Sequence, residues 1–93
     1  MHEDLYVIYG NIGYCLSGMG YYDQALSYLM HVRKITDGKR YFAWHAIAAA
    51  YCHWKLLRPD LCEAELLYAK NRPEYHKDLK ASIKMYPEIA GKL

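Results

Sequence analysis

Apolar residues recur every three or four positions over residues 5–16 and again over about 22–35, and this period predicts two amphipathic helices. Two glycines within residues 18–20 end the first helix, because glycine supplies the backbone freedom of a tight turn. A second turn is expected at Asp37-Gly38. Residues 5–38 are therefore predicted to form a helical hairpin.

Three further helices are expected in the rest of the chain. An alanine-rich helix is predicted over about 40–56, and Arg58-Pro59 ends it because proline restricts the residue before it. A short fourth helix follows over about 59–70. Asn71-Arg72-Pro73-Glu74 has the capping-box pattern of a helix start, so a fifth helix is predicted to begin there. Pro87 stops or kinks that helix and leaves a short tail.

The two halves of the chain share one pattern of large and small residues. The first and third helices correspond at a distance of 35 positions, in the pairs Tyr9 with Trp44, Ile12 with Ile47, Gly13 with Ala48 and Leu16 with Tyr51. The second and fourth helices correspond at 39 positions, in the pairs Tyr22 with Leu61, Ala25 with Ala64 and Leu29 with Tyr68. The additional four residues amount to about one helical turn. They predict that the third helix is one turn longer than the first.

This pattern resembles the tetratricopeptide (TPR) repeat, with Val32 and Asp37 standing where that family prefers alanine and proline. The residues that carry the resemblance are Tyr9, Ile12, Gly13, Leu16, Gly20, Tyr22, Ala25 and Leu29. The resemblance implies an all-α fold, a TPR-like α-solenoid of two helical hairpins plus a C-terminal capping helix, with about five helices in all. Its single domain would span 1–93, with repeat one at about 5–38, repeat two at about 40–71 and the C-terminal helix at about 72–86.

The resemblance also implies an inner groove lined by the first helix of each repeat. The groove positions of the first repeat are Val7, Gly10, Asn11, Tyr14 and Ser17. Those of the second repeat are Phe42, His45, Ala49, Cys52 and His53. Such a groove would be apolar and aromatic, which suits an amphipathic helix or an extended hydrophobic peptide. Packing of Tyr14 or Phe42 against neighbouring helices is an equal alternative. The lysines with which chaperone-binding members of the family clamp a carboxylate are absent, and Asn11 alone matches.

The two tryptophans have different interpretations. Trp44 occupies a position that defines the repeat, so packing explains it. Trp54 lies in the additional turn of the third helix, where no repeat rule requires a tryptophan. Beside Leu57 it is a candidate anchor for a partner, because tryptophan is enriched at binding hot spots. The alternative is that Trp54 packs against the C-terminal helix.

Composition narrows the classes of partner. The chain has 93 residues, 54% of them hydrophobic, which fits one packed domain. A formal charge of +2 gives no strong nucleic-acid signal, and the lysines after Ala69 fit a solvated helix face. No apolar run approaches the roughly 20 residues of a membrane span. Three cysteines without CxxC spacing favour a reducing, cytoplasmic location, and no signal peptide is recognised.

Motifs of catalysis and of metal binding are not found in the sequence. His45 and Cys52 are seven positions apart on one helix, about 10 Å along its axis, which is too far for one metal ion. No orienting acid accompanies a cysteine–histidine pair, and Glu63 and Glu65 face different sides of one helix. The sequence therefore predicts no catalytic residue, no metal site and no cofactor.

Together these observations predict a protein–protein interaction module that is a small cytosolic chaperone or adaptor for an apolar client segment. A narrower resemblance, to the small TPR chaperones of bacterial type III secretion systems, rests on size, groove character and repeat number. Repeat arrays usually need about three repeats to bury their faces. A partner, a second copy in a homo- or hetero-oligomer, or the rest of a longer solenoid is expected to cover the remaining surface. Nucleic-acid binding through the C-terminal lysines is the least favoured alternative.

Overall fold

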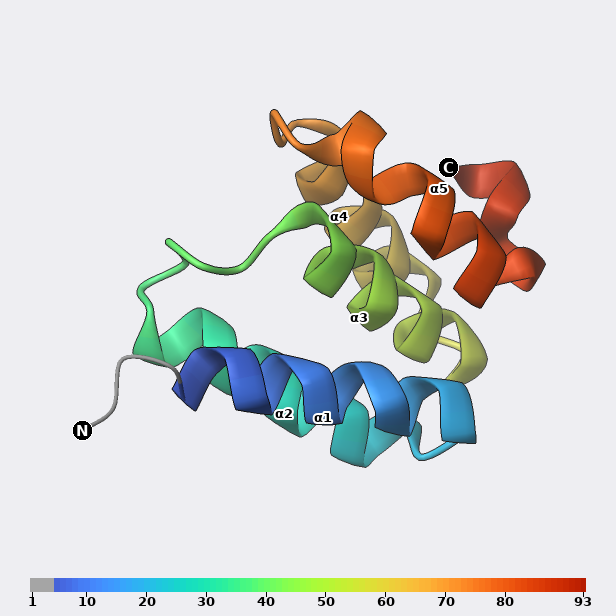
Figure 1. Ribbon diagram of the computed structural model, residues 1–93. Coiled ribbons are helices and arrows are strands. Elements are labelled where there is room, and N and C mark those ends of the chain that lie inside the picture. Colours follow the sequence, from blue (N-terminus) through green and yellow to red (C-terminus); the bar gives the residue numbers. More distant parts are fainter. Residues whose placement is uncertain (1–4) are drawn as a thin grey trace.

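The computed structural model describes residues 5–93 and contains only helices in that range (Figure 1). The α-helices are α1 (Leu5–Met19), α2 (Tyr22–Ile35), α3 (Ala43–Lys55), α4 (Pro59–Lys70) and α5 (Tyr75–Met85), and a 3-10 helix, η1 (Pro87–Lys92), follows them. The prediction of an all-α fold is confirmed. No described helix is both long and apolar enough to cross a membrane.

Helices α1 and α2 pack closely against each other at Gly13, which has no side chain. A Cβ atom added at Gly13 would lie 2.9 Å from Cγ of Leu29 and 3.1 Å from the carbonyl oxygen of Ala25. The two helices can approach this closely only because no side chain stands between them. Figure 1 shows α1 and α2 as one layer, with α3 and α4 packed above it and the C-terminal helices beyond them.

Helix α3 lies at the centre of the molecule. Ten of its thirteen residues are buried, and five of the thirteen are alanines. Helices α1, α2, α4 and α5 all contact α3, and short alanine side chains allow several helices to pack against it at once. Four of these alanines join the main core cluster with Leu29, Tyr41, Tyr86 and Ile89, and Ala50 belongs to a smaller cluster with Cys62 and Leu66.

The residues after Pro87 form part of the core, where the sequence predicts only a short tail. Ile89 of η1 is fully buried. Tyr86, at the junction of α5 and η1, is also buried, and its hydroxyl lies 2.6 Å from Oγ of Ser17 on α1. Glu88 accepts hydrogen bonds from the Tyr51 hydroxyl at 2.9 Å and from Nζ of Lys55 at 2.8 Å. The C-terminal segment is thus fastened to both α1 and α3.

The prediction that the third helix is one turn longer than the first is wrong, because α3 has 13 residues and α1 has 15. Both helices end in the same left-handed turn, at Gly20 and at Leu57, which are 37 positions apart. The buried faces of α2 and α4 correspond at this distance too, in the pairs Ala25 with Cys62, Leu29 with Leu66 and Val32 with Ala69. The second hairpin therefore has two additional residues, and Leu61 and Ala64 are exposed.

The turn after α3 places a leucine where the backbone favours glycine. Leu57 has φ of 60°, and its side chain is 87% exposed. The backbone N–H of Arg58 bonds to the carbonyl of His53 at 2.8 Å, and that of Leu57 bonds to Trp54 at 3.1 Å. This hydrogen-bond pattern defines a Schellman motif, whose left-handed position is usually glycine. Leu57 therefore has backbone strain without compensating burial of its side chain.

We predict that Leu57→Gly raises the free energy of unfolding by about 0.5–1 kcal/mol, measured by urea denaturation. Relief of left-handed strain, about 1–2 kcal/mol, exceeds the entropy that glycine adds to the unfolded chain, about 0.5–1 kcal/mol. Gly20→Ala is the reverse control, because it replaces the glycine at the corresponding left-handed position of the first turn. Gly20 has φ of 90° and only one atom close to an added Cβ, at 3.9 Å, so the variant should lose about 1 kcal/mol. A destabilised Leu57→Gly protein would contradict this account of the turn.

Candidate partner-binding groove

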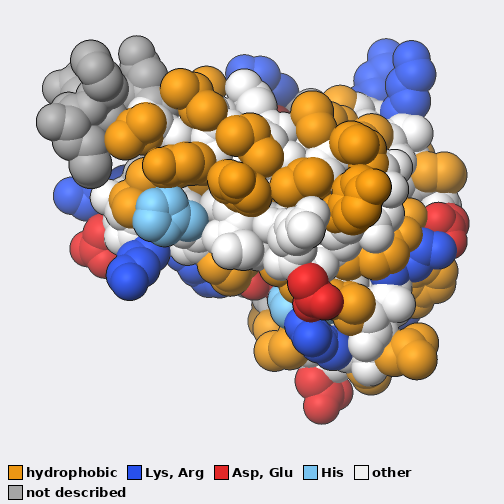
Figure 2. Space-filling view, turned by 90° about the horizontal axis from the view of Figure 1, so that it is seen from below, with side chains coloured by type: hydrophobic (Ala, Val, Ile, Leu, Met, Phe, Trp, Pro, Cys, Tyr) orange, Lys and Arg blue, Asp and Glu red, His pale blue; other side chains and the backbone are white. Residues whose placement is uncertain are grey.

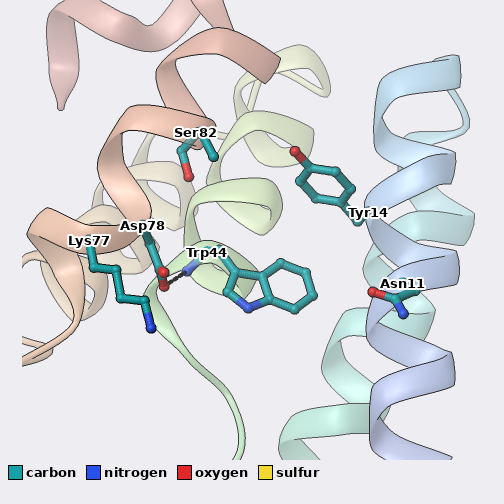
Figure 3. Close-up of a pocket in the computed structure, with 7 residues that line it drawn as sticks. Asn11, Tyr14, Trp44, Lys77, Asp78 and Ser82 are labelled. Carbon is teal, nitrogen blue, oxygen red and sulfur yellow. Dashed lines mark hydrogen bonds between the residues drawn. The ribbon is translucent and has the colours of Figure 1, made fainter.

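A hollow of about 300 Å³ opens between α1 and α5, with Trp44 of α3 at its floor (Figure 3). Its lining residues are Asn11, Tyr14, Trp44, Lys77, Asp78, Ala81 and Ser82. A second hollow of about 240 Å³ shares Trp44, Lys77 and Asp78 and extends the first toward Phe42 and Glu74. The two together are called the α1–α5 groove below.

The indole of Trp44 is held on two sides. It stacks on His45 with ring centroids 3.6 Å apart and planes inclined by 24°. Tyr14 of α1 meets it edge to face, at 5.7 Å and 88°. Figure 3 shows Tyr14 and Asn11 reaching from α1 toward α5, with the indole between the two helices. The floor of the groove is therefore an aromatic surface whose orientation is fixed by its neighbours.

Two carboxylates at the N-terminal end of α5 cap the first turn of α3: Glu74 immediately precedes α5, and Asp78 lies in its first turn. Glu74 accepts the backbone N–H of Ala43 at 2.9 Å, and Asp78 accepts that of Trp44 at 3.2 Å. These N–H groups have no partner within the helix, and the N-terminal end of a helix attracts negative charge. This contact corrects the predicted capping box. Asn71 caps the C-terminal end of α4, and the Glu74 side chain makes no cap for its own helix.

The protonation equilibria of the two carboxyl groups shift in opposite directions. Burial raises the pKa of Glu74, but the hydrogen bonds from Arg72 and from the Ala43 backbone, with the charge of Arg72, outweigh it and lower the pKa overall. The pKa of Asp78 is raised because burial dominates over the hydrogen bond from Trp44. Nε of Arg72 lies 2.9 Å from Oε2 of Glu74, and this ion pair helps to hold the carboxylate in place.

Lys77 provides the cation of the groove. It lies on the exposed side of α5, one residue before Asp78, and Figure 3 shows its side chain extending along the rim. Within residues 5–93, no carboxylate lies within ion-pair distance of its ammonium group. The groove thus combines an aromatic floor with an amide, hydroxyl groups and one available positive charge.

The structure brings together three of the predicted site residues, Asn11, Tyr14 and Phe42, and places them in this groove. Val7 is exposed near the start of α1 but lines neither hollow. Trp54 is half-buried at the other end of α3, where it packs against both core clusters. With Leu57 and Pro59 it borders a separate open hollow of about 340 Å³.

The prediction that His45, Ala49, Cys52 and His53 line an open groove is wrong, because all four are buried. Ala49 and Cys52 belong to the core cluster that contains Tyr86 and Ile89. Helix α5 and η1 therefore cover the face of α3 that the resemblance assigns to the groove. Gly10 and Ser17 of α1 are buried as well, Gly10 against the imidazole of His45 and Ser17 against Tyr86.

His45 has a structural role that its burial explains. Only 2% of it is exposed, and its Nδ1 accepts the backbone N–H of Phe42 at 2.9 Å. A Cβ atom at Gly10 would lie 2.8 Å from its Nε2, so the glycine makes room for the ring. Burial lowers the pKa of His45 to about 4, and the charge of Glu74 opposes this shift only in part. The imidazole is therefore neutral in the folded protein near pH 7.

Six groove residues were not predicted from the sequence as site residues: Trp44, Glu74, Lys77, Asp78, Ala81 and Ser82. One signal could have indicated the two carboxylates among them. The start of α3, Tyr41-Phe42-Ala43, contains no serine, threonine, aspartate or asparagine to cap the helix, so a cap had to come from elsewhere. Glu74 and Asp78 are four positions apart on one helical face, which suits them to that role.

The groove residues suit recognition by stacking and hydrogen bonding. Among the described residues, no group of three histidine, cysteine, aspartate or glutamate side chains could hold a metal ion. Burial raises the pKa of the Cys52 thiol to about 12, which keeps it protonated at neutral pH. No protein-family model matches the chain, and neither curated proteins nor solved structures gave a match. The TPR assignment therefore remains a prediction from the sequence pattern.

We predict that His45 makes stability fall as the pH is lowered from about 6.5 to about 4. In this window the unfolded chain binds a proton at His45 and the folded chain does not, so protonation favours unfolding. The loss reaches about 2–3 kcal/mol at pH 4 and is absent above pH 6.5. Urea denaturation of the parent and of His45→Gln, which keeps an acceptor for Phe42, isolates this contribution. A His45 pKa near 6.5 in the folded protein by NMR would contradict it.

A second prediction concerns the cap that α5 provides. Glu74→Ala should lower the free energy of unfolding by about 1–2 kcal/mol, because the Ala43 N–H loses its acceptor. Glu63→Ala is the matched control, since Glu63 makes only an exposed ion pair with Lys92 at 3.6 Å and should cost less than about 0.5 kcal/mol. Thermal and urea denaturation measure both variants. Equal losses in the two would show that α5 does not stabilise α3 through this carboxylate.

Proposed function

We propose that this chain is a protein-binding module whose α1–α5 groove holds an apolar segment of a client protein. The segment is an amphipathic helix or an extended hydrophobic peptide that inserts one large side chain over Trp44. In this role the protein is a small cytosolic chaperone or adaptor that shields the segment from water. An aggregation-prone subunit of a type III secretion system is the client class that the sequence resemblance favours.

The observation that supports this proposal is the hollow of about 300 Å³ with Trp44 at its floor. Its volume lies at the lower end of the range for ligand sites, which suits one anchoring side chain rather than a large cofactor. Tryptophan and tyrosine are enriched where partners bind tightly, because they bury much apolar area at little cost in conformational entropy. Trp44 and Tyr14 meet this description.

Polar groups around the floor would set the orientation of the client. The Asn11 amide can bond to a peptide backbone, and Lys77 favours a carboxylate on the client near the rim. Asp78 is occupied by the backbone of Trp44, so it contributes rigidity more than recognition. A client segment with an apolar anchor and an acidic neighbour fits these groups.

A longer TPR-type scaffold is the second candidate function, and the exposed leucines of α4 favour it. Leu61 and Leu67 stand on the face of α4 that points away from the core, and they are 49% and 63% exposed. A following repeat would cover them in a solenoid.

We predict that the groove binds a synthetic amphipathic helix of about 14 residues with leucines at i, i+4 and i+7. A Trp54→Phe background leaves Trp44 as the single tryptophan, so its emission should shift to the blue as the peptide binds, with Kd of about 1–100 μM. Ala81→Arg places a charged side chain in the hollow and should weaken binding at least about 10-fold. Leu67→Arg, on α4, should bind as the background does.

A scrambled peptide of the same composition is the control for non-specific adsorption. An unchanged Trp44 emission at saturating peptide, or equal affinities of Ala81→Arg and Leu67→Arg, would refute the assignment of this groove as the binding site.

A further inference from the structure

The outer face of α1 carries a continuous apolar stripe. Its members follow each other at intervals of three and four residues along the whole helix: Leu5, Ile8, Ile12, Cys15 and Met19. This is the spacing of the a and d positions in a coiled coil. These five residues are called the α1 seam below. Ile8 is 52% exposed and Met19 is 66% exposed, so the ends of the seam face solvent. Gly10, which packs against His45 of α3, lies on the opposite side of the helix.

Helix α1 is also unusual in charge, because none of its fifteen residues is Asp, Glu, Lys, Arg or His. Exposed helices normally carry such residues on their solvent side. Figure 2, which views the α1–α2 hairpin from below, shows hydrophobic side chains in a broad band across this face. Acidic and basic side chains appear at its edges. Tyr21, 52% exposed at the end of the hairpin, adds to the apolar surface.

We infer that the α1 seam packs against the α1 seam of a second copy of this chain. A two-fold interface brings the same patch of both subunits together, so the patch must be complementary to itself. A surface with like charges would repel its own copy, whereas the seam has none to oppose. The spacing of three and four lets the side chains of one helix insert between those of the other.

The size of the face agrees with this occupant. Fifteen residues make a helix about 22 Å long, and the two helices of the hairpin present a face about 20 Å wide. This gives on the order of 400 Å² per subunit, below the roughly 600–1,000 Å² of a standard interface and in the range of a weak, concentration-dependent dimer. The pairing does not rest on the proposed function, because Asn11 and Tyr14 line the α1–α5 groove from another side of α1.

Sedimentation equilibrium of the full chain between about 1 and 300 μM tests the inference. The expected result is a monomer–dimer equilibrium, with a limiting mass of twice the 10.9 kDa of the chain. Ile8→Glu should raise the dimer dissociation constant at least about 100-fold, because the two-fold axis buries two introduced carboxylates. Met19→Lys should act in the same direction. Leu67→Glu, which places a charge on an equally exposed leucine of α4, should dimerise as the parent does.

Circular dichroism of each variant shows that a change of mass is not a loss of fold, since all three positions are half or more exposed. Three results would overturn the inference. One is a parent protein that remains monomeric at 300 μM. Another is a dimer that both seam variants leave intact. The third is a dimer that Leu67→Glu disrupts as strongly as Ile8→Glu. Dimerisation without peptide binding, or the reverse, would separate this inference from the proposed function.

Discussion

The structure depends on close packing around α3. Ten of its thirteen residues are buried, and four other helices contact it. Several helices can share one central helix only if its side chains are short, because helix axes must come within about 8–10 Å of each other. Five alanines meet this requirement. A larger residue at Ala48 or Ala49, which are fully buried, would have no space without displacing a neighbouring helix.

The position of α5 follows from a second need of α3. The first turn of α3 has unpaired N–H groups and no residue before it whose side chain serves as a conventional cap. Glu74, just before α5, and Asp78, in its first turn, provide the acceptors, and in doing so they hold α5 across the start of α3. Tyr86 and Ile89 fasten the other end of the segment to the core. The space left between α5 and α1 is the groove with Trp44 at its floor.

The helices themselves could be predicted well from the sequence. Residues 22–35 and 59–70 are helical as expected, and Gly13 lies where α1 and α2 are in close contact. These features are local, or depend on the size of one residue. The predicted distance of 39 positions between the second and fourth helices was wrong. Ala64 and Cys62 are both small enough to match Ala25, and only burial shows that Cys62 is the one that faces the core.

The groove could be predicted only in part, for a related reason. A helical period shows which residues share a face, but not which neighbour covers that face. Asn11, Tyr14 and Phe42 line the hollows that remain between α1, the start of α3 and α5, whereas Ala49 and Cys52 lie beneath the C-terminal segment. The direction of α5 is set by its carboxylates and by Tyr86, which lie 30 or more positions away from their partners in the chain. No local pattern contains such contacts.

Native-state hydrogen exchange measured by NMR tests the central role of α3 most directly. Backbone amides of residues 47–52 should exchange only through global unfolding, so their opening free energies should equal the unfolding free energy from denaturant titration. Amides at the exposed ends of α1 and α5 should open at lower free energies. Exchange of the 47–52 amides that is faster than that of α1 would contradict the account, because α3 would then not be the helix on which the others pack.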